Sequence, residues 1–138
     1  MAANSNERVR LSSEQLSERI LSFAARVGKV VDALPDSRLG RHIAGQLVRS
    51  GTSPAPNYAE ACGAESRRDF IHKLQICLKE LRETKCWLRL ILRAELMPEK
   101  MLHLLLDECD QLISIVVKSI VTTKQNPKRT KNPQKLLD

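Results

Sequence analysis

Residues 66–93 read SRRDFIHKLQICLKELRETKCWLRLILR, and the spacing of apolar residues in this stretch decides the fold. Within it, one seam of residues recurs at alternating steps of four and three: Phe70, Leu74, Cys77, Leu81, Thr84, Leu88 and Ile91. Such spacing keeps one face of an α-helix apolar along its whole length. The seam predicts a helix over about 67–95 that packs nearly antiparallel to its neighbours.

Apolar residues at helical spacing also mark the segments on either side. A first helix is expected over about 13–34, with Ser12 as its cap and Gln15 reaching back to that cap. A last helix follows the turn at 97–99 and should fade near residue 123. Ser66 is expected to cap the helix that carries the seam.

The sequence of the second helix contains glycine and proline residues that should interrupt it. It is expected to begin after Asp36 or Ser37, and it meets Gly51, Pro54 and Pro56 before helix resumes at about 55–62. Proline has no backbone donor and its ring clashes with the preceding turn, so we expect a kink near Pro54 and Pro56. The chain is thus predicted to be all-α: an antiparallel up-down four-helix bundle over residues 12–123. Residues 1–11 are expected to be flexible, and residues 124–138 to form a disordered basic tail.

Composition limits the classes of protein that the chain can represent. With 138 residues it fits one domain, and with 3% aromatic residues its core must be aliphatic. No signal peptide or membrane-length apolar run is recognised, and four cysteines without a CxxC pair favour free thiols in a reducing compartment. We therefore expect a cytoplasmic protein without membrane contact. The net charge of +7 favours an acidic partner such as RNA or DNA.

The expected helix over 67–95 has two further faces that bear on function. One collects cations at helical spacing, and its candidate nucleic-acid-binding residues are Lys79, Arg82, Arg89 and Arg93. The other interpretation of this face is a solvated surface, with Lys79 paired to Glu83 one turn on. The second face holds Ile76, Trp87 and Leu90, either as an interface between copies of the chain or as part of a wide core.

The sequence lacks the patterns that accompany catalysis. His42, His72 and His103 fall on three different expected helices, and there is no HxxxH or Cys/His cluster. Phosphate-binding and dinucleotide-binding glycine motifs are also missing. We therefore predict no catalytic residues, no metal, no cofactor and no enzymatic activity.

Three stretches together resemble a known family. They are RSGTSPAPNYAEA at 49–61, SRRDFIHKL at 66–74 and KELRET at 79–84. They resemble the bacterial four-helix-bundle family that includes proteins encoded in intervening sequences of large-subunit ribosomal RNA genes. The accessory variability protein of diversity-generating retroelements is similar to that family. The resemblance covers residues from about 16 to 121.

The resemblance implies an antiparallel bundle that assembles into a homopentameric ring or barrel. For the retroelement members it also implies association with nucleic acid or a reverse transcriptase, and many members have no known activity. Its polar motif falls here on Arg49, Ser53, Asn57 and Glu60. On a continuous helix these residues share one face, where Arg49 would bond Ser53 and Asn57 would bond Glu60. A network that ties helices together is the other interpretation.

The sequence thus predicts a non-enzymatic, homo-oligomeric bundle that binds nucleic acid through basic surface, as a possible accessory to a reverse transcriptase. The alternative is a structural or protein-interaction module with no nucleic-acid role.

Overall fold

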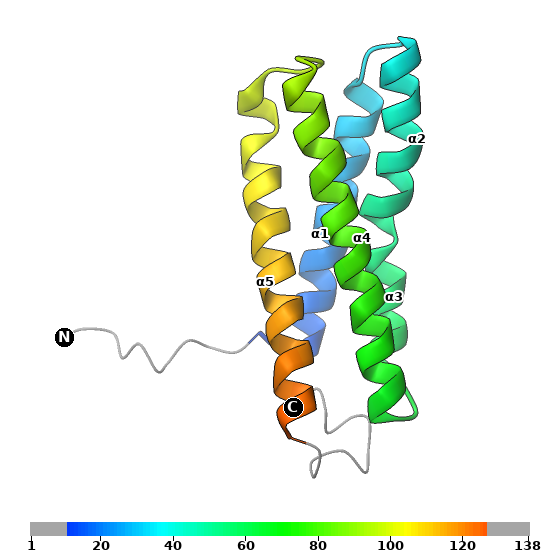
Figure 1. Cartoon of the computed structure of the whole chain (residues 1–138), viewed down its shortest axis with the longest axis vertical. Coiled ribbons are helices and arrows are strands. Elements are labelled where there is room, and N and C mark those ends of the chain that lie inside the picture. The colour runs from blue at the N-terminus through cyan, green and yellow to red at the C-terminus, as the bar shows by residue number, and fades with distance from the viewer. Residues whose placement is uncertain (1–10, 127–138) are drawn as a thin grey trace, which may run out of the picture.

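The computed structural model describes residues 11–126, and within them every regular element is a helix. The elements are α1 (Ser13–Ala33), α2 (Arg38–Thr52), α3 (Pro54–Cys62), α4 (Arg67–Arg93), the short 3₁₀ helix η1 (Glu99–Met101) and α5 (His103–Gln125). Helices α2 and α3 follow one another along one rod (Figure 1), so the five α-helices make a bundle of four rods. The predicted all-α bundle is confirmed. The expected tail lies largely outside the described residues, as do residues 1–10, and α5 runs two residues beyond its predicted end.

Serine side chains start three of the helices. Ser12 Oγ accepts from Gln15 N at 3.1 Å, and Gln15 Oε1 accepts from Ser12 N at 2.9 Å, so α1 begins with the predicted capping box. Ser37, one of the two expected candidates, caps α2 through Gly40 N, and Ser66 caps α4 through Asp69 N. These bonds satisfy backbone donors that have no partner within the helix.

The proline segment divides the second rod at Ser53. Pro54 and Pro56 carry no N–H, so the carbonyl oxygens of Ser50 and Thr52 receive no helical bond from them. Ser53 itself keeps helical backbone angles, φ −61° and ψ −37°, and Asn57 N donates to Ser53 O at 3.3 Å. The chain therefore continues along the same rod as α3.

Contacts between helices show the directions in which they run. Along α2 and α3, residues with increasing sequence numbers bond residues of α4 with decreasing sequence numbers. The pairs are Arg49 with Glu80, Pro54 with Cys77, and Glu60 with Lys73. From α4 to α5 the same holds for Lys85 with Asp110, Leu81 with Cys109, and Arg67 with Thr123. Both pairs of neighbours are antiparallel.

The four rods surround one core. Helix α1 packs on α2, α3 and α5, and α4 packs on the same three helices from the other side. In Figure 1 α4 lies in front and α1 behind, across the core from each other. All seven residues of the seam on α4 are buried, and they meet Phe23, Ile43, Leu47 and Leu112 from the other helices in the core. The outward faces of α1 and α4 therefore point to opposite sides of the bundle.

Gly51 allows α1 and α2 to approach closely. A Cβ atom at Gly51 would lie 2.5 Å from Val27 Cγ1 and 3.0 Å from Val27 Cβ. Because Val27 is fully buried and its Cβ is fixed to the backbone, the helices would have to move apart to admit a side chain. Gly45, on the same helix, has no atom within 4 Å of such a Cβ.

We predict that Gly51→Ala lowers the free energy of unfolding by about 1–2 kcal/mol through overpacking. Gly45→Ala is the matched control and should raise it by about 0.5–1 kcal/mol, since alanine is the better helix former. Urea unfolding followed by circular dichroism measures both. Equal effects of the two substitutions would contradict the close approach at Gly51.

Helix α4 ends in a turn that places a glutamate where glycine is usual. Leu96 N donates to Ile91 O at 3.1 Å and Glu95 N to Leu92 O at 3.0 Å, the two bonds of a Schellman motif. Glu95 has φ +55°, the one positive φ among the described non-glycine residues. A side chain in this conformation is disfavoured because its Cβ crowds the backbone.

We predict that Glu95→Gly raises the free energy of unfolding by about 1 kcal/mol. Glu65→Gly serves as the control, because Glu65 is also exposed in a loop but has negative φ, and it should be neutral or destabilising. Thermal unfolding of the two variants provides the comparison. A destabilising Glu95→Gly would show that the left-handed backbone carries no strain here.

Candidate functional site

The outward face of α4 is cationic from end to end. The eight exposed residues of this helix, here called the α4 stripe, contain five Arg or Lys and no Asp or Glu. They are Arg68, His72, Gln75, Lys79, Arg82, Cys86, Arg89 and Arg93. At 1.5 Å per residue the stripe is about 38 Å long. All four residues predicted to bind nucleic acid lie on it, and Arg68 extends it by about three turns at the same four-and-three spacing.

The ion pairs of α4 explain why its outward face carries no negative charge. Three residues that flank the seam pair with neighbouring helices: Lys73 with Glu60 at 2.7 Å, Lys85 with Asp110 at 2.6 Å, and Glu80 with Arg49 at 3.0 Å. Glu83 also pairs with Arg49, so the sequence-based pairing of Lys79 with Glu83 is not observed. Among the described residues, none of the five stripe cations makes an ion pair.

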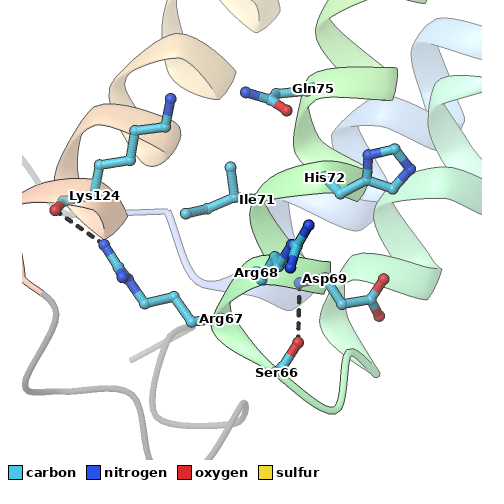
Figure 2. A pocket seen from close by; sticks show the side chains of 8 residues that line it. All are labelled: Ser66, Arg67, Arg68, Asp69, Ile71, His72, Gln75 and Lys124. Atoms are coloured by element: carbon cyan, nitrogen blue, oxygen red, sulfur yellow. Dashed lines mark hydrogen bonds between the residues drawn. The ribbon is translucent and has the colours of Figure 1, made fainter.

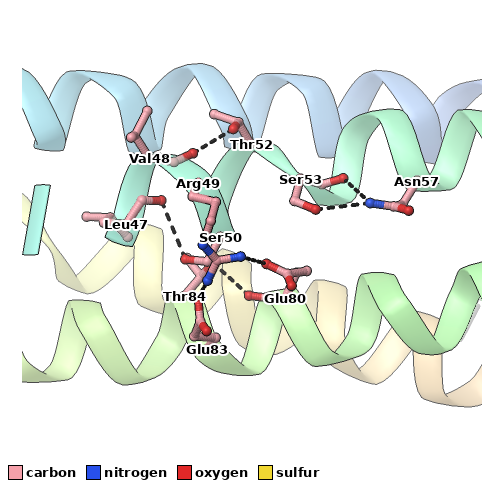
Figure 3. A network of polar contacts seen from close by, with 10 residues as sticks. All are labelled: Leu47, Val48, Arg49, Ser50, Thr52, Ser53, Asn57, Glu80, Glu83 and Thr84. Atoms are coloured by element: carbon pink, nitrogen blue, oxygen red, sulfur yellow. Dashed lines mark hydrogen bonds and ion pairs between the residues drawn. The ribbon is translucent and has the colours of Figure 1, made fainter. Parts of the chain in front are cut away.

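The family's polar motif braces the second rod against α4. Figure 3 shows the Arg49 guanidinium between Glu80 and Glu83 of α4, while Glu60 bonds Lys73 further along the same helix. The Asn57 side-chain amide donates to Ser53 O at 2.9 Å and to Ser53 Oγ at 3.0 Å, beside the proline break.

The structure therefore corrects the bonds expected within the motif. Arg49 and Glu60 reach α4 rather than Ser53 and Asn57, because the outer face of the second rod lies directly beside the acidic and basic flank of α4. This geometry favours a network that ties helices together, one of the two interpretations that the sequence left open.

A buried polar cluster lies beneath Arg49 and was not foreseen from the sequence. Ser50 and Thr84 are fully buried, and their hydroxyl groups are hydrogen-bonded at 3.0 Å across α2 and α4. Glu80 is also nearly buried, with 12% of its side chain exposed. One signal was present: Thr84 is the only hydroxyl residue in an otherwise apolar seam.

We predict that Arg49→Ala lowers the free energy of unfolding by about 1–2 kcal/mol, because the Glu80 carboxylate would remain buried without its cation. Arg41→Ala is the control: its partner Asp36 is 90% exposed, so the loss should stay below about 0.5 kcal/mol. Adding Glu80→Gln to Arg49→Ala should recover part of the loss. Denaturant unfolding of the three variants tests this, and equal losses at Arg49 and Arg41 would contradict it.

The predicted interface residues lie on the flank of α4 that faces α2. Ile76, Trp87 and Leu90 are all half-buried, and Trp87 and Leu90 pack against the core. The Trp87 ring meets His42 of α2 edge-on, with centroids 5.9 Å apart. A wide core thus accounts for part of this strip, and the exposed remainder lies beside the α4 stripe.

One end of the α4 stripe borders a shallow depression. Figure 2 shows its lining, with Arg68, His72 and Gln75 from α4 and Lys124 from α5. Arg67 donates to Thr123 O and Lys124 O, both at 3.0 Å, and so binds the carbonyl end of α5. This contact offsets the negative end of the α5 dipole close to the stripe.

The described residues offer little for catalysis. No group of three or more His, Cys, Asp or Glu among them is placed to hold a metal ion. Burial raises the pKa of the Cys77 and Cys109 thiols to about 12, so these thiols stay protonated at neutral pH. Cys86 differs from Cys77 and Cys109, because it is exposed on the α4 stripe. Within the described range no helix is long and apolar enough to span a membrane.

Fold and site together define a class: a helical bundle with a braced interior and a cationic outer stripe. Residues 14–118 match the family described as 23S rRNA-intervening sequence protein, and the chain belongs to this family. It is also similar to a crystal structure from Bacteroides thetaiotaomicron, a protein of unknown function from the S23 ribosomal protein family. The two share 32% identity with a TM-score of 0.72, over 76% of this chain and 97% of the other. No curated protein matches.

Proposed function

We propose that this chain is a non-enzymatic, self-associating bundle that binds nucleic acid along the α4 stripe. The observation that carries the proposal is the sorting of charge on α4. Two of its three acids, Glu80 and Glu83, pair with Arg49, while five cations remain exposed and unpaired within the described structure. A line of exposed Lys and Arg attracts phosphates and releases their counterions. The family's association with ribosomal RNA genes agrees with such a ligand but does not identify it.

The form of the stripe favours a double helix over a single strand. Every aromatic residue in the described range is buried or half-buried: Phe23, Tyr58, Phe70 and Trp87. No exposed Phe, Tyr or Trp ring is therefore available to stack on unpaired bases, and His72 is the one exposed ring on the stripe. A straight row of long cationic side chains instead suits phosphates of duplex DNA or structured RNA, without sequence recognition.

Self-association forms the second part of the proposal. Large apolar side chains are exposed on α1 and α5, with Leu104 at 62% and Leu21 at 55%. The half-buried Ile76, Trp87 and Leu90 add apolar area beside the stripe. A homopentameric ring and an accessory role beside a reverse transcriptase are the forms that the family resemblance implies. A protein-interaction module without a nucleic-acid role is the alternative, and the half-buried strip supports it.

We predict that the affinity for a labelled RNA duplex falls steeply with salt, and that Arg82→Ala/Arg89→Ala reduces the slope of log K against log salt by about 1–2. Fluorescence anisotropy from 50 to 200 mM salt measures both. The matched control is Lys29→Ala/Lys118→Ala, which removes two exposed cations from α1 and α5 and should leave the slope unchanged. Binding that is absent at low salt, or that both double variants weaken equally, would contradict the proposal.

A further inference from the structure

The outward faces of α1 and α4 carry opposite charge. Whereas the α4 stripe has five cations and no acid, the exposed residues of α1 include three acids, Glu14, Glu18 and Asp32, and one cation, Lys29. The two helices lie across the core from one another, so their outward faces point in opposite directions (Figure 1). The exposed charges thus sum to −2 on the outward face of α1 and to +5 on that of α4.

The acidic side has an apolar centre and charges that nothing in the described structure neutralises. Glu14 and Glu18 lie one turn apart and form no ion pair with a described residue. The described cation nearest to them in sequence, Arg19, is bonded to Glu108 of α5 at 2.6 Å and 2.8 Å, and this bond raises the pKa of Arg19. One turn after Glu18 comes Leu21, which is 55% exposed. We call Glu14, Glu18 and Leu21 the α1 patch.

The basic side has a matching form. Arg89 and Arg93 are one turn apart, the same spacing as Glu14 and Glu18, and one further turn along the stripe is the small exposed residue Cys86. Leu90 and Trp87 flank this part of the stripe and are half-buried. Two cations one turn apart, a small residue and an apolar flank complement two carboxylates and a leucine.

We propose that the α1 patch of one copy docks on the Cys86–Arg93 part of the α4 stripe of a second copy. The interface is head-to-tail, because the two copies contribute different faces, and a docked pair keeps one free α1 patch and one free stripe. The inference rests on the self-association and cationic surface proposed above. It adds that a docked copy and a nucleic acid compete for Arg89 and Arg93, so duplex binding should dissociate the assembly.

Two variants, each impaired on one face, test the docking. Glu14→Lys/Glu18→Lys breaks the α1 patch and keeps the α4 stripe intact. Arg89→Ala/Arg93→Ala breaks the α4 stripe and keeps the α1 patch intact. All four side chains are exposed, and unchanged thermal unfolding would show that both variants fold. Light scattering at low salt should give the wild type at least twice the 15.6 kDa monomer mass, and each variant the monomer mass. Mixing the two variants should restore a 1:1 pair near 31 kDa, roughly twice the monomer, because a head-to-tail interface needs one intact face from each.

Controls separate this interface from general charge effects. Glu65→Lys/Glu99→Lys makes the same charge change at exposed positions outside α1 and α4 and should leave the mass of the wild type unchanged. A mixture that stays monomeric, an assembly that survives in either variant, or a wild type that is monomeric at low salt would overturn the inference.

Adding the RNA duplex to the wild type tests the competition. The mass of the protein assembly should fall as duplex is bound, and Glu14→Lys/Glu18→Lys should bind duplex at least as tightly as the wild type. If the variants pair but no duplex binds, the proposed function fails and the docking stands. If duplex binds with the predicted salt slope but the variants do not pair, the docking alone fails.

Discussion

Seven residues of α4, spaced alternately by four and three, are all buried, and this one seam constrains the rest of the molecule. A 27-residue helix that buries one face along its full length needs partners of equal length on both sides. Helices α2 and α3 together supply one, and α5 supplies the other. The seam also fixes where every other residue of α4 can point, because the helical period leaves no freedom once one face is inside.

That constraint sorts the charges of α4. Residues beside the seam reach the neighbouring helices, and there the sequence places Lys73, Glu80, Glu83 and Lys85, each with a partner of opposite charge. Residues opposite the seam reach only solvent, and there the sequence places cations. Helix α4 therefore holds neighbouring helices together through the residues beside its seam and presents a basic surface on its outward face. The acidic residues that would neutralise the stripe are occupied in the brace.

The same sorting applies to the whole bundle. Because α1 and α4 lie across the core, their opposite outward charges lie on opposite sides of the molecule and cannot cancel within one copy. A charge separation of this kind favours contact with something outside the chain, either phosphate or another copy. Both proposed activities draw on the same cations, and that overlap gives the bundle a means of exchanging one partner for the other.

Local periodicity was enough to predict α1, α4 and α5, the serine caps and the cationic face of α4, since these depend on residues three or four apart along the chain. The same periodicity did not predict which side chains contact one another between helices. Arg49 was expected to bond Ser53 and instead bonds Glu80 and Glu83, more than 30 residues away. Neither the buried Ser50–Thr84 contact nor the close approach at Gly51 follows from spacing, because both depend on which helix packs opposite. The sequence by itself determined the helices and their faces; only the tertiary structure decided which faces meet, because packing pairs residues distant in sequence.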